Sequence, residues 1–133
     1  MNIKDKIEEI ESDEKMPNIY ILHSLLELAM RVTGLGDDSE DYTNTIYFPL
    51  GDMTINCCEY YGTLSISDEE SDEVEISEGN EELILKLIKE IKKRILDYDK
   101  EIKKIREKAS EKIFYKPLNK DLKEKLFGER EEI

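Results

Sequence analysis

Residues 46–66 read IYFPLGDMTINCCEYYGTLSI. Apolar and polar residues alternate from Ile46 to Leu50 and again from Met53 to Cys57, and a period of two is typical of a strand with one buried face. Gly51-Asp52 between them is a two-residue hairpin signal, and Gly62 marks a second reversal before the next alternating segment. The stretch therefore predicts an antiparallel meander.

A short fourth strand is indicated after the acidic run Asp68–Glu73, where Val74 and Ile76 alternate with glutamates. Pro49 favours an edge position for the first strand, because proline has no backbone N–H to donate to a neighbour. We expect an α+β fold with a small antiparallel sheet of three or four strands, packed by helices.

Two helices are predicted before the sheet. Residues 1–15 carry isoleucines three and four residues apart among acidic residues, with Asn2 placed to cap the first turn. A second helix is expected over about 19–33, with Gly34 as its glycine C-cap. This helix and the sheet together span residues 19–78.

The most regular pattern covers residues 80–112, where apolar residues are spaced alternately four and three apart. Such a heptad repeat predicts a coiled coil, and a continuous helix over this range would be about 48 Å long. A short helical tail is expected over 113–133. The predicted seam consists of Ile84, Ile88, Ile91, Ile95, Tyr98, Ile102, Ile105 and Ala109.

The partner of this seam is the main structural question. In a parallel homodimer Arg94 would meet Asp99 and Glu101 would meet Arg106, both pairs opposite in charge. We therefore expect a homodimer through the C-terminal helix. Two alternatives remain within one chain: the acidic first helix could dock on the seam, or the tail helix could fold back on it.

Composition indicates one soluble, acidic domain. The chain has 133 residues, with 38% hydrophobic and 40% charged residues and a net charge of −13. These values exclude collagen-like and disulfide-dense classes, and no run of 18 apolar residues predicts a membrane span. Residues 1–85 hold 22 Asp and Glu against 4 Lys and Arg, whereas residues 86–125 hold 15 Lys and Arg against 8 Asp and Glu. The acidic excess disfavours direct nucleic-acid or membrane binding.

Few residues point to chemistry. Cys57 and Cys58 are adjacent, so an intramolecular bridge between them would be strained, and reduced thiols favour a cytoplasmic location. His23, the only histidine, is expected to form an exposed pair with Glu27 one turn later. Phosphate-binding, nucleophile-elbow and metal-ligand motifs are missing from the sequence. We expect no catalytic residues, no cofactor and no metal.

Carboxylates cluster in the loops and edges around the predicted sheet, with more at 75–82. Carboxylates along a rigid surface can imitate phosphates and occupy a basic nucleic-acid-binding cleft of another protein. In size, charge and lack of catalytic motifs the chain resembles small acidic counter-defence inhibitors of phages and mobile elements, such as anti-CRISPR and anti-restriction proteins. The expected acidic partner-binding residues are Asp37, Asp38, Glu40, Asp41, Asp68, Glu69, Glu70, Asp72 and Glu73.

Other functions fit parts of the sequence. Type III secretion chaperones are small, acidic and dimeric, and residues 20–77 loosely resemble their helix-then-strands start, although the heptad helix departs from that fold. A dimer that sequesters a small ligand is another possibility. A nucleic-acid binder could use Lys92, Lys93 and neighbouring lysines of the basic helix, but the acidic remainder would repel phosphates.

Overall fold

The computed structural model describes residues 2–13, 15–39, 43–68, 73–77, 79–102 and 109–127. Over these ranges the chain forms five helices and a five-stranded antiparallel sheet, which confirms the predicted α+β class. In chain order the elements are α1 (Ile3–Glu11), α2 (Asn18–Thr33), β1 (Asp37–Asp38), β2 (Thr45–Leu50), β3 (Met53–Cys58), β4 (Thr63–Ser67), β5 (Glu73–Ile76), α3 (Glu81–Ile102), α4 (Ala109–Phe114) and α5 (Lys120–Phe127).

The sheet is a meander in which each strand pairs with the next, in the order β1-β2-β3-β4-β5. Leu50 lies opposite Met53, so Gly51-Asp52 forms the two-residue turn that the sequence predicts. β5 contains Val74 and Ile76 and is the predicted fourth strand. The alternation and the turn residues were therefore sufficient to predict this part of the fold.

The sheet has one strand more than the upper number expected. The additional strand is β1, two residues in a segment that the sequence indicates to be an acidic loop. Gly36 precedes β1 with φ of +78°, and a Cβ at this position would lie 2.7 Å from the Tyr47 carbonyl oxygen. Glycine thus allows the close approach that lets the loop pair with β2. The expected edge position of the strand that contains Pro49 is therefore wrong, because β2 lies between β1 and β3. Pro49 is tolerated there because β1 pairs only with Ile46 and Tyr47 and leaves Pro49 without an outer partner strand among the described residues.

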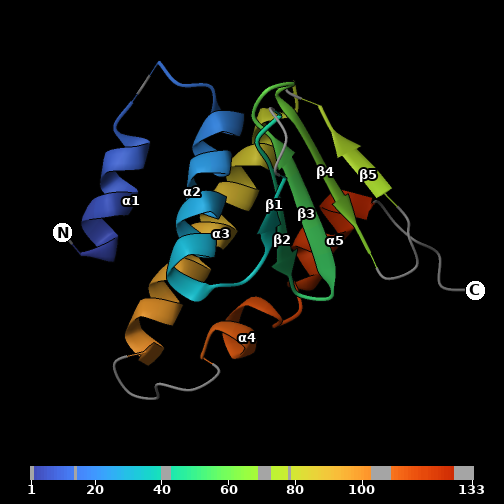
Figure 1. Ribbon diagram of the computed structural model, residues 1–133. Coiled ribbons are helices and arrows are strands. Elements are labelled where there is room, and N and C mark those ends of the chain that lie inside the picture. The colour runs from blue at the N-terminus through green and yellow to red at the C-terminus, as the bar shows by residue number, and fades with distance from the viewer. Residues whose placement is uncertain are drawn as a thin grey trace, which may run out of the picture.

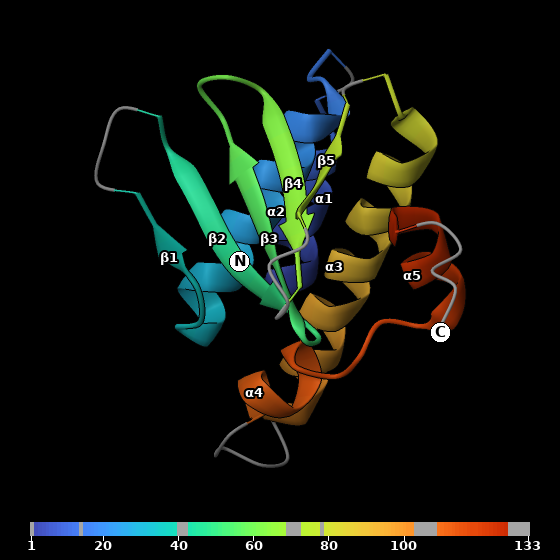
Figure 2. The same ribbon diagram turned by 90° about the vertical axis from the view of Figure 1, so that its right-hand side faces the viewer.

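The helices form a layer on one face of the sheet (Figures 1 and 2). α2 packs on β2 and β3, and α3 packs beside α2. Their apolar side chains share one core with the inward-facing strand residues. α2 ends as predicted, because Gly34 is left-handed and its N–H donates to the Met30 carbonyl at 2.9 Å.

α1 docks on α2 and α3 of its own chain. Its first turn is capped as expected, since Asn2 Oδ1 accepts a hydrogen bond from the Asp5 N–H at 2.8 Å. Ile7 is buried in the core, and the Glu11 carboxylate lies 2.8 Å from Lys92 Nζ. The acidic first helix therefore packs on the basic helix, which was the internal alternative to a homodimer.

The prediction of one continuous helix over 80–112 is wrong. The Arg94 guanidinium donates hydrogen bonds to the carbonyl oxygens of Ile113 and Phe114, each at 3.0 Å. In a continuous helix residues 94 and 113 would be about 28 Å apart. The chain therefore reverses between α3 and α4, and α4 lies against α3 (Figure 1). This reversal places the Phe114 ring in the core, edge-to-face with Phe48 at 5.1 Å between centroids.

The described part of the heptad seam packs inside the protomer. Ile105, and the side chains of Ile102 and Ala109, lie outside the described residues. In the single chain the other seam positions are at most 9% exposed, so the stripe that the sequence assigns to a coiled-coil seam is corrected to a core-facing stripe. A repeat of four and three marks an apolar helix face whether its cover is another subunit or the same chain. The seam side chains buried in this core are Ile84, Ile88, Ile91, Ile95 and Tyr98.

Candidate protein-binding surface

The face of the sheet opposite the helices is polar. Figure 2 shows the strands in front of the helix layer, and no described helix lies across their near side. The strand register places alternate residues of neighbouring strands on this same face. Pro49 and Cys58 share this face. We call its polar and charged residues the open sheet face: Asp37, Thr45, Tyr47, Thr54, Asn56, Thr63, Ser65, Ser67, Glu73 and Glu75.

All charges on the open sheet face are negative. Asp37 lies on β1, whereas Glu73 and Glu75 lie on β5 at the opposite edge, and all three are exposed. No Lys or Arg occurs between Arg31 and Lys86, so no strand carries a cation. Four strand spacings of about 4.8 Å put the two edges roughly 19 Å apart. The face is an anionic surface with carboxylates on both edges.

A row of hydrogen-bonding side chains crosses this surface. Tyr47 lies opposite Asn56, Asn56 opposite Ser65, and Ser65 opposite Glu75. Asn56 Oδ1 is buried and has no hydrogen-bond partner within the described residues. A buried acceptor left unpaired costs about 1–3 kcal/mol. Within the described residues the middle of the row thus contributes a hydrogen-bond acceptor between Tyr47 and Ser65.

Exposed tyrosines surround one end of the open sheet face. Tyr60 and Tyr61 form the turn between β3 and β4 and are 61% and 60% exposed. Their rings are edge-to-face, with centroids 4.8 Å apart. Tyr47 adds a third exposed ring on the face itself. Because tyrosines are enriched in protein–protein interfaces, the combination of tyrosines and carboxylates favours a protein partner.

The structure divides the predicted acidic residues between two edges of the sheet. Asp37 and Asp38 form β1 and are exposed, whereas Glu73 begins β5. Asp68 follows β4 and is half-buried. The remaining predicted acidic residues lie outside the described ranges: Glu40, Asp41, Glu69, Glu70 and Asp72.

Sequence reasoning did not combine the polar residues of the central strands into one surface with the carboxylates. The alternation already placed Tyr47 and Asn56 on the outer sides of their strands. What was missing was the register, which aligns them with Ser65 and Glu75. The spacing of two residues between Glu73 and Glu75 was the available signal that both share this face.

The two cysteines have different environments and both are free thiols. Cys57 lies in the core, where burial raises the pKa of its thiol to about 12. Burial also tends to raise the pKa of the Cys58 thiol. Hydrogen bonds from the Thr45 and Thr63 hydroxyls and from the backbone at Tyr60 and Tyr61 outweigh it and lower the Cys58 pKa below its usual value.

We expect iodoacetamide to modify Cys58 at least roughly tenfold faster than Cys57 in the folded protein near pH 8, because the thiolate is the reactive form. Mass spectrometry of the Cys57→Ser and Cys58→Ser variants would measure the two rates separately. In urea, where both thiols are exposed, the two alkylation rates should converge. Equal rates in the folded state would show that the two thiols do not differ in pKa and accessibility as the structure indicates.

His23 does not form the exposed pair with Glu27 that the sequence indicates. It is only 2% exposed, and its Nε2 donates to the Asn44 carbonyl at 2.8 Å. Its Nδ1 lies 3.9 Å from a Glu59 carboxylate oxygen, while Glu27 pairs with Arg31 at 3.1 Å. The helical spacing predicted the wrong environment for His23, because Asn44, just before β2, and Glu59 lie against it.

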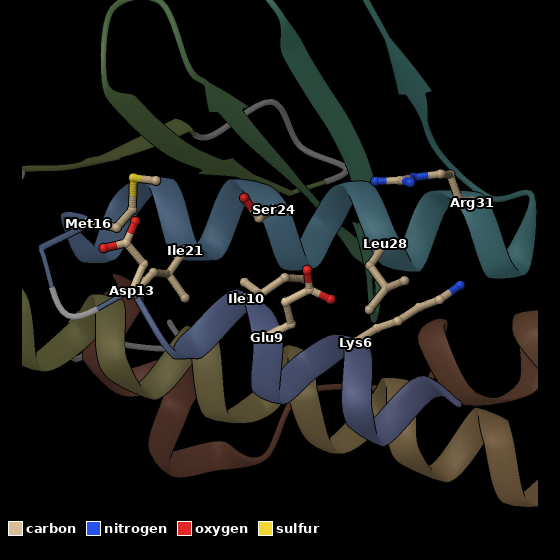
Figure 3. Close-up of a pocket in the computed structure, with 9 residues that line it drawn as sticks. All are labelled: Lys6, Glu9, Ile10, Asp13, Met16, Ile21, Ser24, Leu28 and Arg31. Carbon is tan, nitrogen blue, oxygen red and sulfur yellow. The ribbon is translucent and has the colours of Figure 1, made fainter. Parts of the chain in front are cut away.

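A groove of about 470 Å³ lies between α1 and α2. Figure 3 shows Lys6 and Arg31 at one end and Asp13 and Met16 at the other. Small-ligand sites have a few polar groups that converge on one point, but here the charged groups are spread along the groove. No group of three His, Cys, Asp or Glu side chains in the described part of the chain could hold a metal ion.

The fold and its surface define a class, an α+β domain with an open anionic sheet face. No family model, curated protein or solved structure matches the chain. None of the helices in the described ranges is long and apolar enough to cross a membrane.

Proposed function

We propose that this protein is a non-catalytic binding protein whose open sheet face engages a basic surface on another protein. The observation that carries the proposal is the charge of the sheet: carboxylates on both edges and no Lys or Arg between Arg31 and Lys86. A rigid surface of one charge attracts a complementary surface and raises its association rate.

The preferred partner is a protein whose basic cleft holds nucleic acid. Glu73 and Glu75 are two strand residues apart, about 6.7 Å, so their carboxylates form a short row of negative charges on β5, as the phosphates of a nucleic-acid strand do. Serine, threonine and asparagine between the sheet edges supply further acceptors, as phosphate and sugar oxygens do. In this role the protein would act as an inhibitor, as acidic anti-CRISPR and anti-restriction proteins of phages and mobile elements do.

The proposal is tested on a partner captured from the native host and identified by mass spectrometry. Neutralising the edges with Asp37→Asn/Glu73→Gln/Glu75→Gln should slow association about tenfold or more, because these charges lie on the face that meets the partner and set the local potential there. Stopped-flow or surface plasmon resonance would measure the rate at low and high salt. The wild-type rate should fall steeply with salt, because surface charges farther apart than about 10 Å at 0.1 M are screened.

The matched control is Glu8→Gln/Glu111→Gln/Glu124→Gln, which removes three exposed carboxylates away from the open sheet face. This control should bind within about twofold of wild type, since it leaves the charges of the open sheet face in place and more distant surface charges are screened by salt. Wild type should also compete with a DNA or RNA probe for the partner. Phosphate mimicry would be contradicted if the edge-neutralised variant bound the partner as fast as the control. It would also be contradicted if the protein bound its partner but did not displace the DNA or RNA probe.

A further inference from the structure

A second surface of opposite charge lies on the solvent side of α3. It is a groove of about 530 Å³. Its apolar floor includes Leu85, which is 51% exposed, and Ile88 and Leu96. Leu85 and Leu96 are three helical turns apart, so the floor runs about 16 Å along the helix. Leu85 is the one large hydrophobic side chain of α3 that is mainly exposed in the described residues, and it lies in the same groove as Ile88 and Leu96.

Lysines flank this floor on one side. Lys89, Lys93 and Lys100 are exposed and line the groove. No carboxylate of the described residues pairs with any of the three. Lys92 on the other side is already paired with Glu11 of α1. Asp97 is the other carboxylate that lines the groove beside Glu11. The three lysines that pair with no described carboxylate outnumber it and form one flank, parallel to the apolar floor. We call these lysines and the floor the lysine groove.

We propose that the lysine groove binds an acidic amphipathic helix of a partner protein. Helix-in-groove recognition requires apolar anchors three, four and seven residues apart in the bound helix, and the floor from Leu85 to Leu96 is long enough for such anchors. Carboxylates on one flank of that helix would meet Lys89, Lys93 and Lys100. This surface is distinct from the open sheet face, which carries the opposite charge on the other layer of the fold.

Charge complementarity selects this occupant over the others. A second copy packed through the same groove would oppose lysine to lysine. Nucleic acid and anionic lipid would both be repelled by the chain's net charge of −13. Nucleic acid would in addition leave the apolar side chain of Leu85 exposed to water. An acidic helix with apolar anchors would pair its carboxylates with the lysines and bury the apolar side chains of the floor.

The test is fluorescence anisotropy with the full chain and a synthetic helical peptide of about four turns, with leucines on one face and glutamates on one flank. A companion peptide with lysine in place of glutamate and a DNA duplex serve as competing probes. The acidic peptide should bind at least roughly tenfold more tightly than either. Lys89→Gln/Lys93→Gln/Lys100→Gln should weaken its binding about tenfold or more, and Leu85→Ser should weaken it about tenfold with little effect on the salt dependence.

The matched control is Lys4→Gln/Lys15→Gln/Lys120→Gln, which removes three exposed cations that do not line the groove. It should change binding by less than about twofold. The proposal is overturned if the control loses as much affinity as the groove variant, or if the acidic peptide binds no more tightly than the lysine peptide. The proposal is also overturned if the DNA duplex binds, the acidic peptide does not, and the triple lysine variant loses DNA binding, because nucleic acid would then be the occupant. Tighter peptide binding by Glu129→Gln/Glu131→Gln/Glu132→Gln would instead assign the groove to the chain's own acidic tail.

Discussion

Arg94→Met should destabilise the protein by about 3–5 kcal/mol, the range found when one partner of a buried ion pair is removed. The guanidinium is 5% exposed and lies 2.9 Å from the Glu90 carboxylate. Methionine would fill much of the volume but donate nothing, so Glu90 and four carbonyl oxygens, one buried and three part-buried, would lose this donor. The carbonyl oxygens that accept from Arg94 belong to Ile113, Phe114, Lys116 and Pro117.

Urea denaturation followed by circular dichroism would measure this loss. Arg31→Met is the matched control, because Arg31 is exposed and its pair with Glu27 is also an i,i+4 pair. The control should cost no more than about 1 kcal/mol. Arg94→Lys should fall between the two, since it keeps the charge but not the planar fork of donors. Equal losses for Arg94→Met and Arg31→Met would show that the Arg94 cluster contributes no more than a surface pair.

The Arg94 cluster, which consists of Arg94, Glu90 and the carbonyl groups that accept hydrogen bonds from Arg94, stabilises the reversal of the chain after α3. The guanidinium satisfies carbonyl groups at the end of α4 that have no partner within that helix. The Phe114 carbonyl also accepts from the Gly51 N–H at 2.7 Å, which ties the same segment to the turn between β2 and β3. A straight helix would have left these groups and the Phe114 ring in water.

Ile95→Asp should remove most of the stability of the fold, with a loss of about 4–5 kcal/mol or more. Ile95 is buried in the core of a single chain, so the substitution both opens a cavity and places an unpaired carboxylate in an apolar environment. Domains of this size have a total stability of about 5–15 kcal/mol. Circular dichroism and size-exclusion chromatography with light scattering would measure folding and mass together.

This variant separates the two explanations of the heptad pattern. If Ile95 belongs to the core of one chain, Ile95→Asp loses helical signal and cooperative unfolding. If it lies in a homodimer seam, the variant is a folded monomer and the wild type a dimer. Lys93→Asp, on the exposed side of the same helix, is the control and should keep its fold, because surface substitutions usually change stability by about 0.5 kcal/mol.

The sheet was the most predictable part of this protein. Strand alternation and turn residues are local signals: the faces of β2 and β3 follow from a period of two, and Gly51-Asp52 selects the two-residue hairpin between them. β1 was not predictable in the same way. Its pairing depends on the close approach of Gly36 to Tyr47, a contact made in space and not marked by any apolar pattern.

The helices show the limit of local signals more clearly. The sequence correctly placed an apolar stripe on residues 84–98, but the stripe alone does not say which surface covers it. The cover comes from α1, α2 and α4, and the reversal before α4 depends on Arg94, whose partners are 19 to 23 residues away. His23 was assigned to the solvent for the same reason, since its cover comes from Asn44.

The sequence by itself determined the α+β class, the strands β2 to β5, the capping of the first two helices and the separation of acidic and basic charge, because each of these follows from residues close together in the chain. Only the tertiary structure decided that the heptad stripe lies in the core of one chain. It also decided that Asp37 and Glu75 flank one open face and that the lysines of α3 point away from it. Those features depend on strand register and on which helix faces are covered, and both are set by packing between residues far apart in the sequence.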